Sequence, residues 1–177
     1  NRRTYFHHQI GNAVFIGLDS YYVLPYEGIQ QDFIRNISKQ YKSQGRFAYY
    51  HNPTYPGCSK KISESQLYWS SLFEEYNFTG IFENHHHMFK KTLPLVQGVP
   101  VTSGGITYFG DGNWGVISTP NCGKKKWQKT GIFETVDDLN HVWILQYNQT
   151  NYKIFPINVA GEKFYKSTKG NFIVNQD

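Results

Sequence analysis

The fold is decided by a short apolar stretch near the N-terminus, Ala13-Val14-Phe15-Ile16-Gly17-Leu18, which runs into Asp19-Ser20. A continuous apolar run of this length is typical of a strand buried on both faces, and such strands are usually covered by helices. A helix is predicted directly after it, over residues 29–41, and Gly45 ends this helical segment. The apolar residues that recur there at helical spacing are Ile29, Phe33, Ile34, Ile37 and Tyr41.

The alternation of strand and helix continues along the chain. Residues 46–50 predict a second strand, and His51-Asn52-Pro53 closes it because proline cannot continue regular pairing. A capping box at Ser63-Glu64-Ser65-Gln66 indicates the start of a second helix. Residues 78–82 predict a third strand. This order indicates an α/β layer architecture.

The second half of the chain predicts short strands without a helical period. Glycine-punctuated strands are expected at residues 99–102 and 106–109. Residues 141–147 and 152–157 predict a β-hairpin, in which Pro156 places the second strand at an edge or a bulge.

Composition limits the class of protein. At 177 residues, with 39% apolar and 18% charged residues, the chain can bury one sizeable core and is not a disordered tail. No stretch approaches the roughly 18 to 20 apolar residues that cross a bilayer, and the first residues lack the apolar region of a signal peptide. Residues 1–177 are expected to be a single domain or a portion of one. The chain does not begin with methionine, which suggests a cleaved, trimmed or partly represented product.

The net charge of +5 favours anionic partners. The densest basic block is Lys124-Lys125-Lys126, with Lys129 close behind. Such a block is most often a solvated loop face; the alternatives are that it attracts phosphate-bearing ligands or binds nucleic acid. Because no other basic stripe with interleaved aromatic residues occurs, nucleic acid is not the expected partner.

The cysteines and the N-glycosylation sequons give information on the cellular compartment of the protein. Cys58 and Cys122 allow at most one bridge and are expected to form a disulfide if the compartment is oxidising. Sequons for N-glycosylation begin at Asn36, Asn77 and Asn148. In a chain this rich in asparagine about two would arise by chance. The sequons therefore favour a secreted or lumenal protein only mildly.

Four of the seven histidines follow predicted strands: His51 follows one, and His85, His86 and His87 follow another. Ligands bind beyond the carboxyl ends of strands in α/β sheets, and neutral imidazole is a common ligand for zinc, iron and manganese. Residues i and i+2 of an extended segment point to the same side, so His85 and His87 are expected to converge while His86 points away. The alternative is a polar, solvated strand end without metal.

Other candidates rank below these histidines. His7, His8 and His141 have no partner in sight and are not expected to bind metal. Asp19 and Asp111 are candidate carboxylate ligands, although each also fits the turn-forming aspartate that often follows a strand.

Four stretches form an ordered set: AVFIGLDS (13–20), FAYYHNPTY (47–55), LFEEYNFTGIFENHHHMFKKTLP (72–94) and GITYFGDGNWG (105–115). Together they resemble the C-terminal half of a calcineurin-like metallophosphoesterase, and the nearest branch is the purple acid phosphatases. The corresponding family features are a strand ending in Leu-Asp, a strand ending in His-x-Pro, a strand ending in Gly-His-x-His before Tyr-Glu-Arg, and a glycine-rich strand pair. Each motif is weak alone, whereas the ordered set is fairly specific.

The resemblance implies a fold and a chemistry. The fold would be α/β, part of a two-sheet β-sandwich flanked by helices. His51 and His85 would bind one ion of a dinuclear centre and His87 the other, with iron paired with zinc, manganese or a second iron. Such a centre hydrolyses phosphate monoesters, because a metal lowers the pKa of its bound water and paired ions stabilise the attacking and leaving oxygens. A secreted or lysosomal location is implied as well.

The chain departs from the family pattern in several places. The motifs that supply the bridging aspartate and the asparagine ligand would precede residue 13, and they do not occur there. We therefore expect the N-terminal half to be a separate chain or a segment outside this one, unless it has been lost together with the activity. Asn84 replaces a glycine, and Phe89-Lys90-Lys91 replaces Tyr-Glu-Arg, which inverts one charge near the site. The loop of residues 55–61 lacks histidine, although its lysines could attract phosphate.

The leading hypothesis is a metallophosphatase that acts on a phosphate-ester substrate. The first alternative is a catalytically degraded domain of the same fold that serves as a binding or structural component. The second alternative is an unrelated α/β domain whose histidines are polar residues at strand ends.

Overall fold

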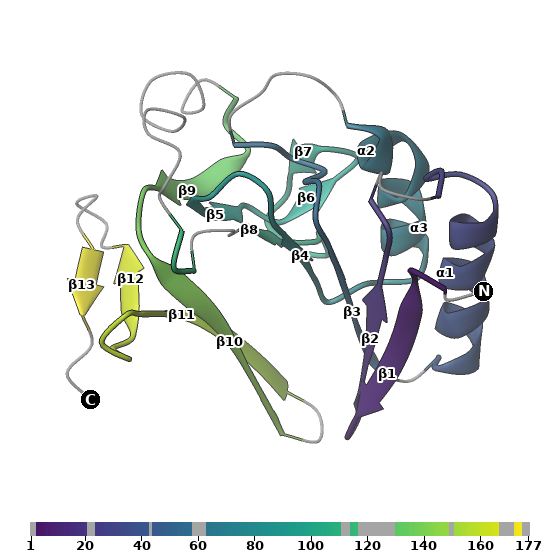
Figure 1. Ribbon diagram of the computed structural model, residues 1–177, viewed down its shortest axis with the longest axis horizontal. Helices are drawn as coiled ribbons and strands as arrows, with labels where there is room; N and C mark the ends of the chain where they lie inside the picture. Colours follow the sequence, from purple (N-terminus) through teal and green to yellow (C-terminus); the bar gives the residue numbers. More distant parts are fainter. Residues whose placement is uncertain are drawn as a thin grey trace.

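The computed structural model describes residues 3–20, 24–42, 44–57, 63–110, 114–116, 130–148, 151–166 and 172–174. Within them the main element is a seven-stranded mixed sheet with the strand order β1-β2-β3-β4-β8-β5-β9 (Figure 1). β2, β3, β4 and β8 are parallel neighbours, whereas β1 and β5 run antiparallel to the strands beside them. The bounds are β1 Phe6–Ile10, β2 Ala13–Gly17, β3 Gly45–Tyr50, β4 Gly80–Glu83, β5 Phe89–Thr92, β8 Tyr108–Gly110 and β9 Phe133–Asp137.

The helices of the described chain follow the predicted order and lie on one side of the sheet (Figure 1). α1 (Ile29–Gln40) joins β2 to β3, and α2 (Glu64–Tyr68) and α3 (Ser70–Glu75) join β3 to β4. The Ser63 hydroxyl accepts from the Gln66 amide at 3.3 Å, which confirms the predicted cap. The second predicted helix is divided at Trp69, whose buried indole donates to the Tyr26 carbonyl at 2.7 Å. No helix in this part of the chain is long and apolar enough to span a bilayer.

The side of the sheet under the helices holds the hydrophobic core. Side chains alternate along a strand, so Val14 and Ile16 contribute to this core whereas Phe15 lies on the other side. The core also contains aliphatic and aromatic residues of the helices and of the neighbouring strands. Its fully buried members include Ile34, Ala48, Trp69, Phe73 and Ile81.

The opposite side of the sheet carries a row of aromatic rings, and a hairpin covers part of it (Figure 1). The hairpin consists of β10 (His141–Asn148) and β11 (Asn151–Asn158), close to the predicted ranges, and Pro156 lies opposite Trp143. The Tyr152 ring contacts Phe47 with 5.2 Å between ring centroids, and its hydroxyl donates to the Asn12 carbonyl at 2.9 Å. This contact fixes the tip of the hairpin against the start of the sheet.

Several short strands differ from the predictions. The strand expected at residues 99–102 is reduced to β7 (Val99–Pro100), paired with β6 (Leu95–Val96), and the strand expected at 106–109 is β8. β1, β5 and β9 were not predicted, and neither were β12 (Phe164–Lys166) and β13 (Phe172–Val174). β1 and β9 are the outermost strands of the main sheet, where polar residues are common and the apolar pattern is weak.

Candidate functional site

His51 and His85 meet at the carboxyl ends of two neighbouring parallel strands. His51 follows β3 and His85 follows β4, and Tyr50 pairs with Glu83 at the last position of the register. The Nε2 atom of His51 lies 3.0 Å from the Nδ1 atom of His85, with the rings inclined at 75°. Both side chains are exposed at the surface. The predicted convergence of histidines from two strand ends is therefore present for this pair.

The backbone at the end of β4 differs from the extended segment expected over residues 85–87. β4 ends at Glu83, and His85 has a φ of 72°, so the chain turns there. The positive φ falls on His85 and not on Asn84, which replaces the family glycine. Asn84 instead joins the two strand ends: its amide donates to the His51 carbonyl and its side chain to the Tyr50 carbonyl, both at 3.1 Å. The turn and the Asn84 contacts, rather than strand alternation, bring His85 to His51.

His86 and His87 extend the histidine cluster. Partial desolvation, followed by the charges of His85 and His87, lowers the pKa of His51, which favours the neutral imidazole that a metal requires. His86 is half-buried, and desolvation, with the neighbouring Lys90 and the other two histidines, lowers its pKa to about 4. His87 is half-buried as well. The assignment of His87 to a second ion stays a prediction.

The end of β2 supports the same corner of the molecule. The Ser20 hydroxyl accepts from the amides of His51 at 3.0 Å and Asn52 at 2.7 Å. The backbone of Asp19 is held by the Gln30 side chain in α1, with two hydrogen bonds of 2.9 Å, and its own side chain is buried. Asp19 therefore supports the end of β2 through its backbone. Asp111 lies outside the described residues.

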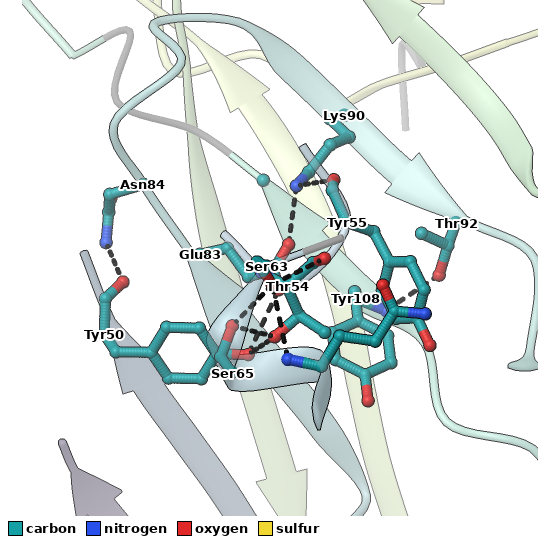
Figure 2. A network of polar contacts seen from close by, with 12 residues as sticks. Tyr50, Thr54, Tyr55, Ser63, Ser65, Glu83, Asn84, Lys90, Thr92 and Tyr108 are labelled. Atoms are coloured by element: carbon teal, nitrogen blue, oxygen red, sulfur yellow. Dashed lines mark hydrogen bonds and ion pairs between the residues drawn. The ribbon is translucent and has the colours of Figure 1, made fainter. Parts of the chain in front are cut away.

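A buried polar network adjoins the histidines (Figure 2). Glu83 and Lys90 form an ion pair of 2.5 Å, and the exposed fractions of their side chains are 0% and 2%. Lys91, the next residue in β5, points the other way and pairs with the partly exposed Glu134 at 2.6 Å. Lys90 places a positive charge where the family pattern has a glutamate, and Glu83 balances this charge. Sequence reasoning overlooked Glu83, although a charged residue at the end of an otherwise apolar strand is a signal.

The remaining predicted residues are placed elsewhere or lie outside the described chain. His7 lies 3.4 Å from the Tyr41 hydroxyl, and His8 stacks on Phe15, so both have partners that the sequence did not reveal. His141 is fully buried, with its ring nitrogens 2.9 Å and 3.2 Å from the carbonyls of Leu139 and Gly110. The residues outside the described chain are Cys58, Cys122, Lys124, Lys125, Lys126 and Lys129.

The three sequons differ in their surroundings. Asn77 and Thr79 are both exposed, in the turn between α3 and β4, where Asn77 has a φ of 51°. Asn36 is exposed on α1, but Ser38 of the same sequon is buried. Asn148 ends β10, and its side chain lies outside the described residues.

The two ring nitrogens of His51 and His85 lie at a spacing that allows both to bind one metal ion. Two nitrogens that bind one ion at about 2.0–2.1 Å, at angles between 90° and tetrahedral, lie roughly 2.8–3.4 Å apart. The 3.0 Å between His51 and His85 fits this range. Among the residues that the structure describes, no three His, Cys, Asp or Glu side chains form a metal-binding group. His51 and His85 could therefore supply two ligands of an ion that needs further donors.

Comparison with solved structures shows that the fold is similar to that of part of a purple acid phosphatase. The purple acid phosphatase PPD1 from seeds of yellow lupin (Lupinus luteus) matches with a TM-score of 0.72 and 13% identity, covering 90% of this chain and 31% of that chain. GAP50, described as the anchor in the inner membrane complex of Plasmodium, matches with a TM-score of 0.52 and 14% identity, covering 94% and 50%.

The matches confirm the predicted fold class and the resemblance on which it rested. This chain spans about a third of the lupin phosphatase and half of the Plasmodium protein. No family model and no curated protein matches the sequence.

Proposed function

We propose that this chain is part of a metal-dependent phosphatase that hydrolyses phosphate monoesters. The observation that carries the proposal is the 3.0 Å approach of the His51 and His85 rings at the carboxyl ends of adjacent parallel strands. The fold similarity to a purple acid phosphatase supports the same reading. His51 and His85 bind one ion, and His87 binds the second.

The residues of this chain have defined tasks in such a site. His51 and His85 bring two ring nitrogens within 3.0 Å of each other, and Ser20 and Asn84 hold the backbone of His51 in place. A pair of ions, iron with zinc, manganese or a second iron, would supply an activated water and stabilise charge on the phosphoryl oxygens. Two cations held close together require carboxylates to offset their charge. These carboxylates come from a segment upstream of this chain or from a separate chain.

The upstream half docks on the aromatic side of the sheet. Phe82 and Tyr49 are only half-buried there, and Phe6 at the edge is 50% exposed, which is costly for a folded domain. The similar solved chains are two to three times longer than the part this chain matches. In a secreted or lysosomal protein, Asn77 is the sequon best placed to carry a glycan, because both of its key residues are exposed.

A second candidate function is a binding or anchoring role without catalysis. The match to GAP50, which is described as an anchor, favours it. A further observation agrees, because Lys90 stands where the phosphatase pattern has glutamate.

Metal analysis of the full-length protein separates the two functions. The phosphatase proposal predicts close to two metal ions per chain and activity on a phosphate monoester, with both reduced by His85→Ala and His87→Ala. His7→Ala is the matched control, because His7 contacts Phe33 of α1 and lies 3.4 Å from the Tyr41 hydroxyl, on the helix side of the sheet. Full metal content and activity in the His85 and His87 variants would remove the assignment. A metal-free, inactive wild-type protein would favour the anchoring role.

A further inference from the structure

A single carboxylate oxygen holds both ends of the loop that carries His51. Oε1 of Glu83 accepts from the Tyr50 hydroxyl at 3.1 Å and from the Thr54 amide at 2.6 Å. Tyr50 precedes His51, and Thr54 follows it by three residues. The position of His51 is therefore tied to Glu83.

Lys90 completes this arrangement from a third strand. Its Nζ atom donates to Oε2 of Glu83 at 2.5 Å and to the Tyr55 carbonyl at 2.7 Å (Figure 2). Glu83 is also two residues before His85, at the end of β4. The ion pair thus connects the end of β3, the loop after it, the end of β4 and β5.

A buried ion pair of this kind adds little net stability compared with apolar residues of similar size. It does impose a fixed geometry, because each charged atom must keep its hydrogen-bond partners once it is removed from water. Here the partners are the segments on either side of His51, while the carboxylate itself belongs to the strand that leads to His85. Fixing the geometry of the pair fixes the distance between the two histidines.

We propose that the Glu83–Lys90 ion pair is a positioning device that sets the separation of His51 and His85 for binding one metal ion. The expected effect on metal binding rests on the proposed function. The effect of the ion pair on the position of His51 does not depend on metal. Partners that orient metal ligands typically change metal affinity about 10- to 100-fold when they are mutated. Lys91 offers a matched control, since Lys91→Met removes a partly exposed ion pair from the same strand.

The test compares Lys90→Met, Glu83→Gln and Lys91→Met in the full-length protein. The first readout is hydrogen exchange of the Asn84 and Thr54 amides, which report the contacts to His51 and Glu83 in metal-free protein. We expect exchange at these amides to rise at least about tenfold in Lys90→Met and to stay unchanged in Lys91→Met. The second readout is the Kd for Zn²⁺, which should rise about 10- to 100-fold in Lys90→Met and in Glu83→Gln and stay unchanged in Lys91→Met.

Two further variants keep the test decisive. If Lys90→Met does not fold, the double variant Glu83→Gln with Lys90→Met removes both buried charges and is measured instead. The exchanged pair, Glu83→Lys with Lys90→Glu, keeps opposite charges but removes the acceptor for Thr54 N–H, so it should not restore metal affinity.

The outcomes separate the inference from the proposed function. Faster exchange of the Asn84 and Thr54 amides in Lys90→Met, together with a wild-type protein that binds no Zn²⁺, would support the positioning role and rule out the metal site. Metal affinity and amide exchange that are the same in Lys90→Met and Lys91→Met would overturn the positioning role, even if the wild-type protein binds metal.

Discussion

The two sides of the central sheet differ in how completely other parts of the chain cover them. On the helix side, Ile16 and Ile81 of the sheet and Ile34 of α1 are fully buried. On the opposite side, the aromatic row is covered by the β10–β11 hairpin at Phe47 and Phe109 but is only half-buried at Phe15 and Phe82. The helix side is therefore a packed core, whereas the aromatic side presents apolar surface that fits another layer of structure.

The largest effect is expected from Trp69→Ala on the helix side. Trp69 is fully buried, packs against Tyr26 and Tyr50, and donates from its indole to a carbonyl. Its removal leaves a large cavity and an unpaired carbonyl, so we expect a loss of about 3–5 kcal/mol in the free energy of unfolding. Chemical denaturation of the full-length protein measures it. A loss below about 1 kcal/mol would show that this side is not a packed core.

A smaller effect is expected from Phe82→Ala on the aromatic side. Phe82 lies between Phe47 and Phe109, with ring centroids 6.3 Å and 5.4 Å away, and is half-buried by this chain alone. If a further segment covers it, the full-length protein should lose about 2–3 kcal/mol, close to the cost at a fully buried site. A loss under about 1 kcal/mol in the same denaturation assay would mean that Phe82 stays exposed and that nothing docks there.

The smallest effect is a pH dependence of stability from His141, which lies where the hairpin meets the sheet. Burial lowers the pKa of His141, and the carbonyls of Leu139 and Gly110 only partly offset it. The unfolded chain then binds the proton more readily. The contribution to stability is therefore present above about pH 6.5 and is lost as the pH falls toward the folded pKa, by at most about 1.4 kcal/mol per pH unit.

Denaturation between pH 7 and pH 5 measures this slope. His141→Gln should reduce this slope, and the lowered pKa values of His51 and His86 account for the part that remains. Greater stability at pH 5 than at pH 7 that depends on His141 would show that the two carbonyls outweigh burial.

The sequence predicted the strand and helix order and the meeting of two histidines, because both follow from local patterns. The apolar run at residues 13–18 and the helical period of residues 29–41 are strong signals, and strand ends in a parallel sheet share one edge. The turn at His85 was not predictable, since non-glycine residues rarely adopt positive φ and the sequence shows no glycine there. The extended geometry assumed for residues 85–87 was wrong for this reason.

β5 was not predicted from the sequence for a different reason. Its sequence, Phe89-Lys90-Lys91-Thr92, contains two adjacent lysines and lacks a clear apolar alternation. Lys90 is buried only because Glu83 on a neighbouring strand compensates it, and this pairing becomes visible only in three dimensions. A residue pattern along one strand does not reveal a partner that another strand supplies.

The central claim, that His51 and His85 bind the same metal ion, is tested most directly by long-range ¹H–¹⁵N spectra of their rings in the full-length protein. We predict that removing metal with a chelator shifts the ¹⁵N signals of His51 Nε2 and His85 Nδ1 together and leaves those of His8 in place. Adding back Zn²⁺ should return both signals with the same midpoint. Ring signals of His51 and His85 that do not respond to the chelator or to Zn²⁺ would contradict it.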